Sequence, residues 1–218
     1  MWCRAIHISS KPEFQCTKEI IKIAVVCSIS KDIFLRASGF HHVDDTARSA
    51  FKHPLSDHLT ILNAFNAYLI VRHKFKDAEG YGHYAIKRWC YEHALNARAL
   101  QEANQLRSKV EWVYTRNMRV NKIPFADPND LTKVRKALAV ALFTHTAIHK
   151  RRDGYATVHE NADGILAPDS SLVENGYEWI VATEFSRSPG GKQILYPATV
   201  IDIKWLVVLM IPESTLLE

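Results

Sequence analysis

The period of the hydrophobic residues changes near residue 150, and this change constrains the fold more than any other feature. Before it, apolar residues such as Leu59, Leu62 and Phe65 recur three and four positions apart, which is the spacing of one helix face. After it, apolar residues fall in short runs rich in β-branched and aromatic side chains, separated by turn signals such as Ser188-Pro-Gly-Gly191. The sequence therefore predicts an α+β chain, a helical bundle followed by a small β-barrel.

Capping and breaking residues set the expected limits of the helices. Thr17 is expected to cap a buried helix, Asp57 to begin the helix that carries the stripe from Leu59 to Leu69, and Pro124 to break the chain. The expected helices span residues 17–30, 44 or 45 to 51, 57 to the exposed loop at 74–84, 85–95, 97–117, and 129 or 130 to 148.

The expected strands follow the period change. They span residues 155–159, 164–167, 178–185 and 193–196. The run Trp205-Leu-Val-Val-Leu-Met-Ile211 is expected to be a further buried strand, because it is far shorter than the ~18 residues that cross a bilayer. No secretory signal is expected, because residues 1–15 lack an apolar core segment.

Charge is distributed unevenly along the chain. From Tyr84 to Arg152 there are fourteen Lys and Arg against five Asp and Glu, a balance of +9. From Asp153 to Glu218 there are three against ten, a balance of −7. Basic charge concentrated on a helical segment favours a polyanionic partner, with an ordinary solvated surface as the alternative.

Motifs for catalysis and for metal binding are missing from the sequence. Asp57-His58 has the composition of an acid/base pair, but helix capping by Asp57 is the favoured interpretation. His145 and His149 are four residues apart on an expected helix, where a solvated face is favoured over a metal site. Neither a G-x-x-x-x-G-K-[ST] phosphate loop nor Asp-Glu-Ala-His occurs, so no ATP site and no intrinsic ATPase activity are expected.

Two segments carry a resemblance to a known family. One contains Asp57-His-Leu-Thr-Ile-Leu-Asn63, and the other is Trp89-Cys-Tyr-Glu-His-Ala-Leu-Asn-Ala-Arg-Ala-Leu100. Arg152-Asp-Gly-Tyr155, Pro168–Leu172 and Glu178-Trp-Ile-Val181 follow in order. Together they resemble the helicase-associated region that lies C-terminal to the motor of DEAH-box ATP-dependent RNA helicases.

The resemblance implies three parts: a partial winged-helix remnant and connector at 1–52, a helical ratchet domain at 53–150, and an OB-fold-like domain at 151–218. The chain also departs from the family. Ala167-Pro-Asp-Ser-Ser171 stands where the family has His-Pro-Ser-Ser, and Tyr196 stands where it has a strand arginine. These two departures argue against RNA contact by the OB part. Separately, Met1–Pro12 does not resemble the start of a winged helix.

In the family, this region grips single-stranded RNA beside the motor domains. The resemblance therefore implies an RNA-binding accessory module without a motor of its own, whose partners are RNA, helicase motor domains and G-patch-type activators, with no membrane. ATP and Mg²⁺ would be needed only if a motor domain is supplied elsewhere. The resemblance also implies a nuclear role in mRNA splicing, with the cytoplasm as the alternative location.

Basic residues of the helical segment are the candidates for contact with RNA phosphates, because guanidinium groups chelate phosphate. The candidates are Arg98, Arg107, Arg116, Arg119, Arg135, Lys136, Lys150, Arg151 and Arg152. Trp89, Trp112, Trp179 and Trp205 would suit base stacking, but core packing is the favoured interpretation for them. Two other functions stay open: a protein-interaction module that does not bind RNA, which the acidic segment favours, and a truncated, diverged helicase-derived product.

Overall fold

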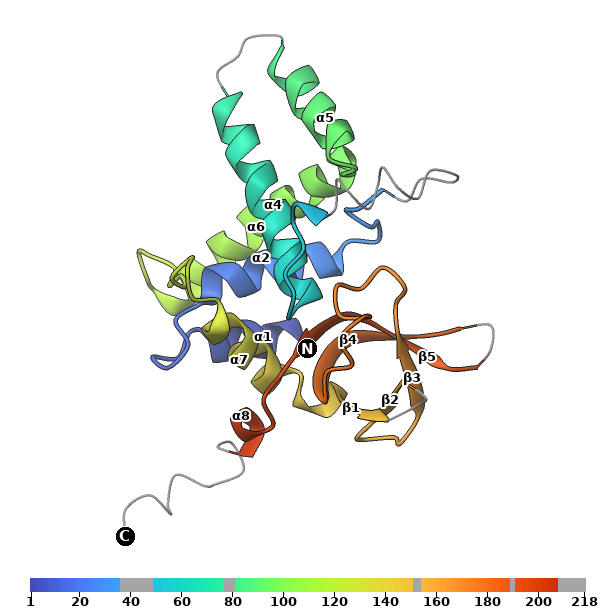
Figure 1. The fold of residues 1–218 in the computed structure, drawn as a ribbon. Helices are drawn as coiled ribbons and strands as arrows, with labels where there is room; N and C mark the ends of the chain where they lie inside the picture. The colour runs from blue at the N-terminus through green and yellow to red at the C-terminus, as the bar shows by residue number, and fades with distance from the viewer. Residues whose placement is uncertain (36–48, 77–80, 151–153, 189–190, 208–218) are drawn as a thin grey trace. The chain divides into compact units, whose positions relative to one another are not determined.

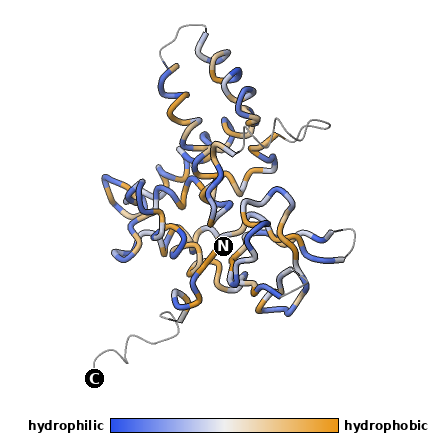
Figure 2. The backbone as a smooth tube through the Cα atoms, viewed as in Figure 1, coloured by the Kyte–Doolittle hydropathy of each residue, from blue (hydrophilic) through white to orange (hydrophobic). Residues whose placement is uncertain are grey.

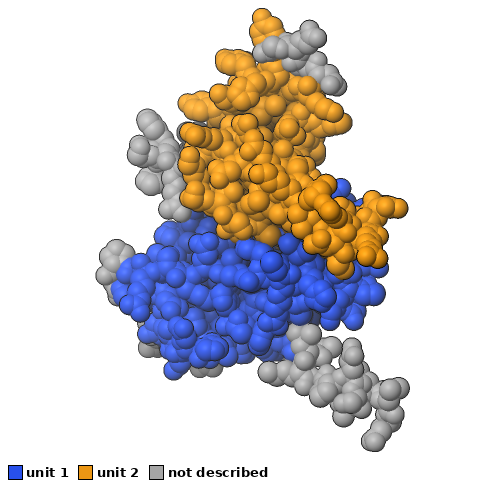
Figure 3. Space-filling model, turned by 180° about the vertical axis from the view of Figure 1, so that it is seen from behind, with its two compact units in different colours: residues 1–20, 54–58, 124–218 blue, residues 21–53, 59–123 orange. Residues whose placement is uncertain are grey.

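The structure, a computed structural model, describes residues 1–35, 49–76, 81–150, 154–188 and 191–207. It is an α+β chain in which helices precede a closed five-stranded barrel, as the sequence predicts (Figure 1). The residues form two compact units that alternate along the chain (Figure 3). Unit 1 comprises residues 1–20, 54–58 and 124–218, and unit 2 comprises residues 21–53 and 59–123. The domain limits expected at 53 and 151 stay predictions.

Unit 2 is helical. It contains most of α2 (Thr17–Ser28) and α4 (Asp57–Lys74), together with α5 (Gly82–Glu92) and α6 (Ala97–Met118). Its core is built from the apolar stripe of α4, where Leu62 and Phe65 are fully buried, and from Leu100 of α6. The helix expected to begin at residue 44 or 45 lies largely outside the described residues. The Thr17 hydroxyl is buried without a hydrogen-bond partner among the described residues, so it does not cap α2.

Unit 1 combines helices with the barrel. Its helices are α1 (Trp2–Ser9), α7 (Thr132–Ala141), the 3₁₀ turn η1 (Phe143–His145) and the short α8 (Lys204–Val207). The strands are β1 (Thr146–Lys150), β2 (Gly154–Thr157), β3 (Asp163–Leu166), β4 (Trp179–Arg187) and β5 (Gln193–Val200). They close in the order β1-β2-β3-β5-β4, and β3 and β5 are parallel, whereas the other pairs are antiparallel.

The interior of the barrel is filled by side chains. Tyr155, Leu172, Ile180 and Leu195 are almost completely buried there. The Tyr155 hydroxyl donates a hydrogen bond to the carbonyl of Tyr177, and burial raises the pKa of Tyr155 to about 12. The barrel is therefore a packed core, and a binding site on it has to lie at its surface or its ends.

Two sequence-based expectations in unit 1 are wrong. The helix expected to reach Ile148 ends at Ala141, and β1 begins at Thr146. His145 and His149 therefore do not share a helix face, because β1 pairs with β2 and β4 and this pairing overrides the local helical spacing. The strand expected from Trp205 begins as helix α8, and residues 208–211 of that run lie outside the described part of the chain.

A buried polar network joins the start of α4 to the barrel within unit 1. Asp57 is 1% exposed and accepts hydrogen bonds from the Ser170 hydroxyl, the Ser171 hydroxyl and N–H, and the Ala198 N–H. Asp57 therefore holds the barrel, and the expectation that its side chain caps α4 is wrong. His58 is fully buried between the hydroxyls of Thr183 and Thr199. Neither Asp57 nor His58 is accessible to a substrate, so the pair does not form a catalytic site.

Candidate nucleic-acid interface

Helix α6 carries three of the basic residues expected to contact RNA, Arg98, Arg107 and Arg116, and a fourth, Arg119, is its C-cap residue. Its N-terminus is capped by Asn96, whose side chain accepts a hydrogen bond from the N–H of Ala99 at 3.1 Å. The buried residues of α6, which are Ala99, Leu100, Ala103 and Asn104, all lie in its first half. The second half of α6 is thus covered much less, and its side chains are available to a partner.

Most of the basic residues of α6 lie on one side of the helix. Lys109 lies about three helical turns after Arg98, and Arg116 lies about five turns after Arg98, so the three side chains face the same way. Trp112 falls within about a sixth of a turn of this direction, and Arg119 is the C-cap residue that follows the last turn. All five side chains are exposed. We call Arg98, Lys109, Trp112, Arg116 and Arg119 the α6 face.

Arg107 lies on the opposite side of the helix, about two and a half turns beyond Arg98. Its guanidinium donates to both carboxylate oxygens of Glu111 at 2.7 Å and to the side-chain oxygen of Asn104 at 3.1 and 3.3 Å. The Arg107 and Glu111 side chains are only 19% and 20% exposed. These contacts use the guanidinium within the helix, which leaves Arg107 poorly placed for phosphate.

A pocket of about 440 Å³ lies beside the first half of α6, between α6, α4 and α5. Three exposed cationic side chains line it, one from each helix: Arg72 from α4, Lys87 from α5 and Arg98 from α6. His83 also lines it, and Gln101 supplies an amide. We call this the cationic pocket.

No Asp or Glu is among the described residues that line the cationic pocket. Three like charges around one cavity repel one another, and a bound anion would relieve this repulsion. Tyr68 forms part of the wall and is 3% exposed. Burial raises the pKa of Tyr68, and the nearby positive charge of Arg72 opposes this rise. The pocket therefore offers cationic donors over an uncharged floor, which suits a phosphate group.

Trp112 contradicts the expectation that the tryptophans pack in the core. Its side chain is 60% exposed, and the guanidinium carbon of Arg116 lies 5.2 Å from the centre of its ring. Trp89, in contrast, stacks on His93 with ring centres 4.3 Å apart. An exposed indole next to arginine provides a flat surface for stacking together with a cation for the adjoining phosphate.

The other expected contact residues belong to unit 1 or to undescribed positions. Arg135 of α7 donates to the Val200 carbonyl at 2.7 and 3.2 Å, and burial lowers the pKa of this guanidinium. Arg135 and Lys136 both approach the Trp205 ring, at 5.2 and 5.7 Å from its centre. Lys150 forms an ion pair with Asp163 and thereby lowers the pKa of that carboxyl group. Arg151 and Arg152 lie outside the described residues.

The structure thus leaves Arg98 and Arg116 exposed along α6 and Arg119 exposed at its C-cap, whereas Arg107, Arg135 and Lys150 have partners within the chain. Sequence reasoning missed Arg72, Lys87 and Lys109. Lys87 and Lys109 belong to the basic segment, so the charge count included them without indicating which helix faces they occupy. Arg72 lies in the last turn of α4, and only the packing of α4 against its neighbours places it beside Arg98.

Comparison with known protein families adds nothing to this assignment, since no family model matches the chain. Within the described ranges, no group of three or more His, Cys, Asp or Glu is suited to hold a metal. The described helices also include none that is long and apolar enough to cross a membrane, and Figure 2 shows polar residues interrupting the apolar ones along them.

Proposed function

We propose that this chain binds single-stranded RNA through unit 2, with phosphates in the cationic pocket and along the α6 face. The observation that carries the proposal is the convergence of Arg72, Lys87 and Arg98 on one cavity without a carboxylate among its described lining residues. Such contacts fix the position of the backbone and do not read the bases. The exposed ring of Trp112 adds a stacking surface that accepts any base.

The wider proposal follows the resemblance to the C-terminal region of DEAH-box RNA helicases. The barrel order, with one parallel pair between β3 and β5, supports an OB-like fold for the second part. In this proposal the helices correspond to a winged-helix remnant and the ratchet domain, and ATP, Mg²⁺ and the motor are supplied elsewhere. The chain would serve a nuclear helicase of mRNA splicing and meet motor domains or G-patch-type activators.

Fluorescence anisotropy with a labelled twelve-nucleotide oligouridine tests the RNA proposal on the full chain. The test variant replaces Arg72, Lys87 and Arg98 together with Ala. A charge-matched control replaces Lys11, Lys192 and Lys204 with Ala; these residues are exposed and belong to unit 1. Because both variants lose three positive charges, a difference between them reports the position of the charge and not its total.

We expect the pocket variant to bind RNA more weakly. The slope of log K against log salt should become less negative by about 2, because three phosphate contacts are lost and each contact to a single strand contributes about −0.7. The control variant should change affinity less than about twofold, because dispersed surface charges contribute little at physiological salt. Mixed-sequence RNA should lose affinity by the same factor as oligouridine. Equal weakening of both variants, or none, would contradict the proposed site.

A second candidate function, protein binding without RNA, is favoured by the charge of the other part of the chain. The segment from Asp153 to Glu218 has three Lys and Arg against ten Asp and Glu, so it repels a phosphate backbone. In this alternative, unit 2 is an ordinary solvated helical surface and the barrel carries the function. Absence of RNA binding at low salt, in the experiment above, would favour it.

A further inference from the structure

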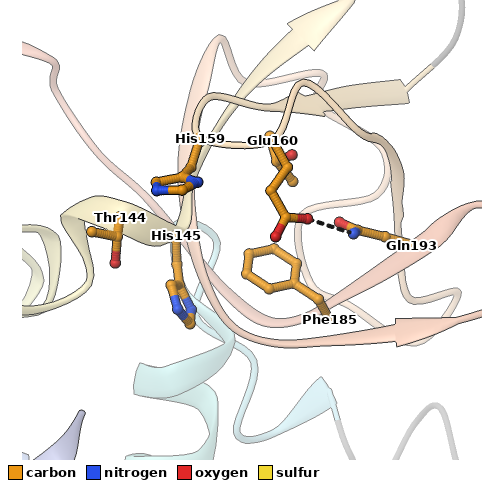
Figure 4. A pocket seen from close by; sticks show the side chains of 7 residues that line it. Thr144, His145, His159, Glu160, Phe185 and Gln193 are labelled. Carbon is orange, nitrogen blue, oxygen red and sulfur yellow. Dashed lines mark hydrogen bonds between the residues drawn. The ribbon is translucent and has the colours of Figure 1, made fainter.

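A second pocket, of about 410 Å³, lies on the barrel in unit 1 (Figure 4). Its walls come from η1, from the end of β2 and the turn after it, and from β4 and β5. Its lining includes the side chains of Glu160, Phe185, Gln193 and His145. We call this the barrel pocket. Glu160 is the one charged Asp, Glu, Lys or Arg among the described residues that line it.

Gln193 presents a hydrogen-bond acceptor that the chain does not satisfy. Its Oε1 atom is buried and accepts no hydrogen bond from any described residue. Its Nε2 atom lies 3.5 Å from a carboxylate oxygen of Glu160, and Figure 4 shows the two groups pointing toward each other. Since a carboxylate only accepts hydrogen bonds, the amide NH₂ belongs on the Glu160 side, and Oε1 is left as an acceptor without a donor.

Glu160 also lacks a cationic partner within the described part of the chain. Lys150, at the same barrel, is paired with Asp163. Arg187 stands opposite Gln193 in the β4–β5 ladder, yet it forms no ion pair with a described residue. The carboxylate of Glu160 and Oε1 of Gln193 are therefore two neighbouring acceptors, and one of them carries a full negative charge.

An aromatic wall accompanies the two acceptors. The half-buried Phe185 ring packs against His145, with ring centres 5.0 Å apart and an angle of 51° between the planes. The His145 Nδ1 atom lies 3.2 Å from the carbonyl oxygen of Ala182, which only accepts, so Nδ1 donates this bond and fixes the imidazole. Phe185 thus has a defined orientation at the edge of the barrel pocket.

We propose that the barrel pocket binds the guanidinium group of an arginine on a protein partner. The planar fork of a guanidinium carries donors on adjacent nitrogens, so it can donate to Glu160 and lie against the Phe185 ring. It can also donate to Oε1 of Gln193 once that amide turns from its buried position into the pocket that the side chain lines. An ammonium group has no planar face to stack and no fixed fork. The balance of −7 over residues 153–218 attracts a basic peptide.

Guanine also presents two neighbouring N–H donors and a flat face, so it is the competing occupant. A guanine in RNA brings phosphates with it, and the acidic charge of the barrel segment repels them. This repulsion favours arginine over guanine. The inference does not depend on RNA binding by unit 2, because the barrel pocket and the cationic pocket share no residue.

Titration of the ¹⁵N-labelled full chain with the peptide acetyl-Gly-Arg-Gly-amide tests the proposal by NMR. The readouts are the side-chain NH₂ of Gln193 and the backbone N–H groups of Glu160 and Phe185. Two peptides serve as controls: one carries lysine in place of arginine, and the other carries citrulline, which keeps the shape of arginine without its charge. We expect saturable shifts at these positions with the arginine peptide and much weaker binding of both control peptides.

Two substitutions separate the roles of charge and acceptor. Glu160→Gln should weaken binding of the arginine peptide about fivefold, because it removes an ion pair at a solvent-accessible site. Gln193→Met should weaken it about fivefold as well, through loss of a neutral hydrogen bond. Glu174→Gln removes the same charge from an exposed residue between β3 and β4 that does not line the pocket, and it should change affinity less than about twofold.

The proposal is overturned if the arginine peptide gives no saturable shifts at these positions, or if the citrulline peptide binds equally well. Equal affinities of the wild type and Glu160→Gln also overturn it. Guanosine is titrated in parallel as a base without phosphate. Binding of guanosine at these resonances without binding of the arginine peptide would identify a base as the occupant and overturn the protein-partner assignment.

Discussion

The carboxylate of Asp57 accepts two hydrogen bonds from Ser171, one from its backbone N–H and one from its hydroxyl, both at 2.7 Å. The second carboxylate oxygen accepts from Ser170 at 2.7 Å and from the N–H of Ala198 at 3.1 Å. One buried charge thereby holds the loop before β4 and the strand β5 together. Hydrogen bonds to a buried carboxylate are among the strongest in proteins, because the acceptor is charged. Removal of the charge leaves several buried donors without an acceptor.

Asp57→Asn should therefore destabilise the protein by about 3 kcal/mol, because the NH₂ group of asparagine cannot accept from the donors that surround it. Urea unfolding followed by circular dichroism measures this loss. Asp202→Asn is the control, because exposed Asp202 accepts one bond from the N–H of Lys204, and asparagine can also accept it. Similar unfolding midpoints for the two variants would show that Asp57 contributes no more than a surface cap.

His58 should remain neutral far below the pH at which an ordinary histidine is protonated. Burial lowers its pKa from 6.5 to about 3. Below about pH 6.5 the unfolded chain binds a proton at this residue and the folded chain does not. The contribution of His58 to the free energy of unfolding is therefore fully present above this pH. It falls as the pH decreases from 6.5 towards 3, at up to about 1.4 kcal/mol per pH unit.

An NMR titration of the histidine ring protons checks this prediction without a substitution. The resonance of His58 should stay constant between pH 7 and pH 5, because the buried ring stays neutral over this range. A His58→Gln variant should also lose part of the acid sensitivity of its unfolding free energy. Titration of His58 near pH 6 would contradict the buried arrangement.

The sequence was sufficient for the fold class and for the elements with a strong period. The stripe of α4 and the apolar run of β4 lie where their patterns predict them. β1 was missed because Thr146–Lys150 continues the spacing of the preceding helix, and its strand state depends on pairing with Ile180 and Ala156, which are distant in sequence.

The candidate site was also predictable only in part, because local sequence shows which helix is basic and does not show which residues meet in the fold. The charge count identified the basic helix that carries Arg98 and Arg116. It did not separate them from Arg107, whose i,i+4 partner Glu111 occupies its guanidinium. Neither pocket was predictable, because each is formed by elements distant in the chain, and Gln193 becomes a buried acceptor only when the barrel closes.

Gly154 is a position where the barrel requires glycine. Its φ is +86°, and a Cβ there would lie 2.5 Å from the carbonyl oxygen of Gly164 on the neighbouring strand. Gly191 has a similar φ of +83°, but nothing lies within 4 Å of its Cβ position. Both alanine variants are strained by the positive φ, and Gly154→Ala alone adds a clash with the backbone.

We therefore expect Gly154→Ala to destabilise the protein by about 2 kcal/mol more than Gly191→Ala, since the clash has to be relieved by separating β2 from β3. Thermal unfolding of the two variants measures the difference. Equal melting temperatures would mean that β2 and β3 adapt without cost.

Trp112 provides the most direct test of the α6 face, because replacing it can change RNA affinity without destabilising the fold. The ring is 60% exposed, so its removal takes little from the core. We expect Trp112→Ala to weaken oligouridine binding about tenfold, given that stacking of a base on an aromatic ring contributes about 1–3 kcal/mol. Trp112→Phe should keep most of the affinity, because it retains a flat ring. Val113→Ala, at a neighbouring residue that is 46% exposed, should bind like the wild type.

Anisotropy titrations of the three variants at one salt concentration measure the effect, with melting temperatures to show that each is folded. If Trp112→Ala binds as tightly as Val113→Ala, the indole does not stack on a base and any RNA contact of α6 is electrostatic alone.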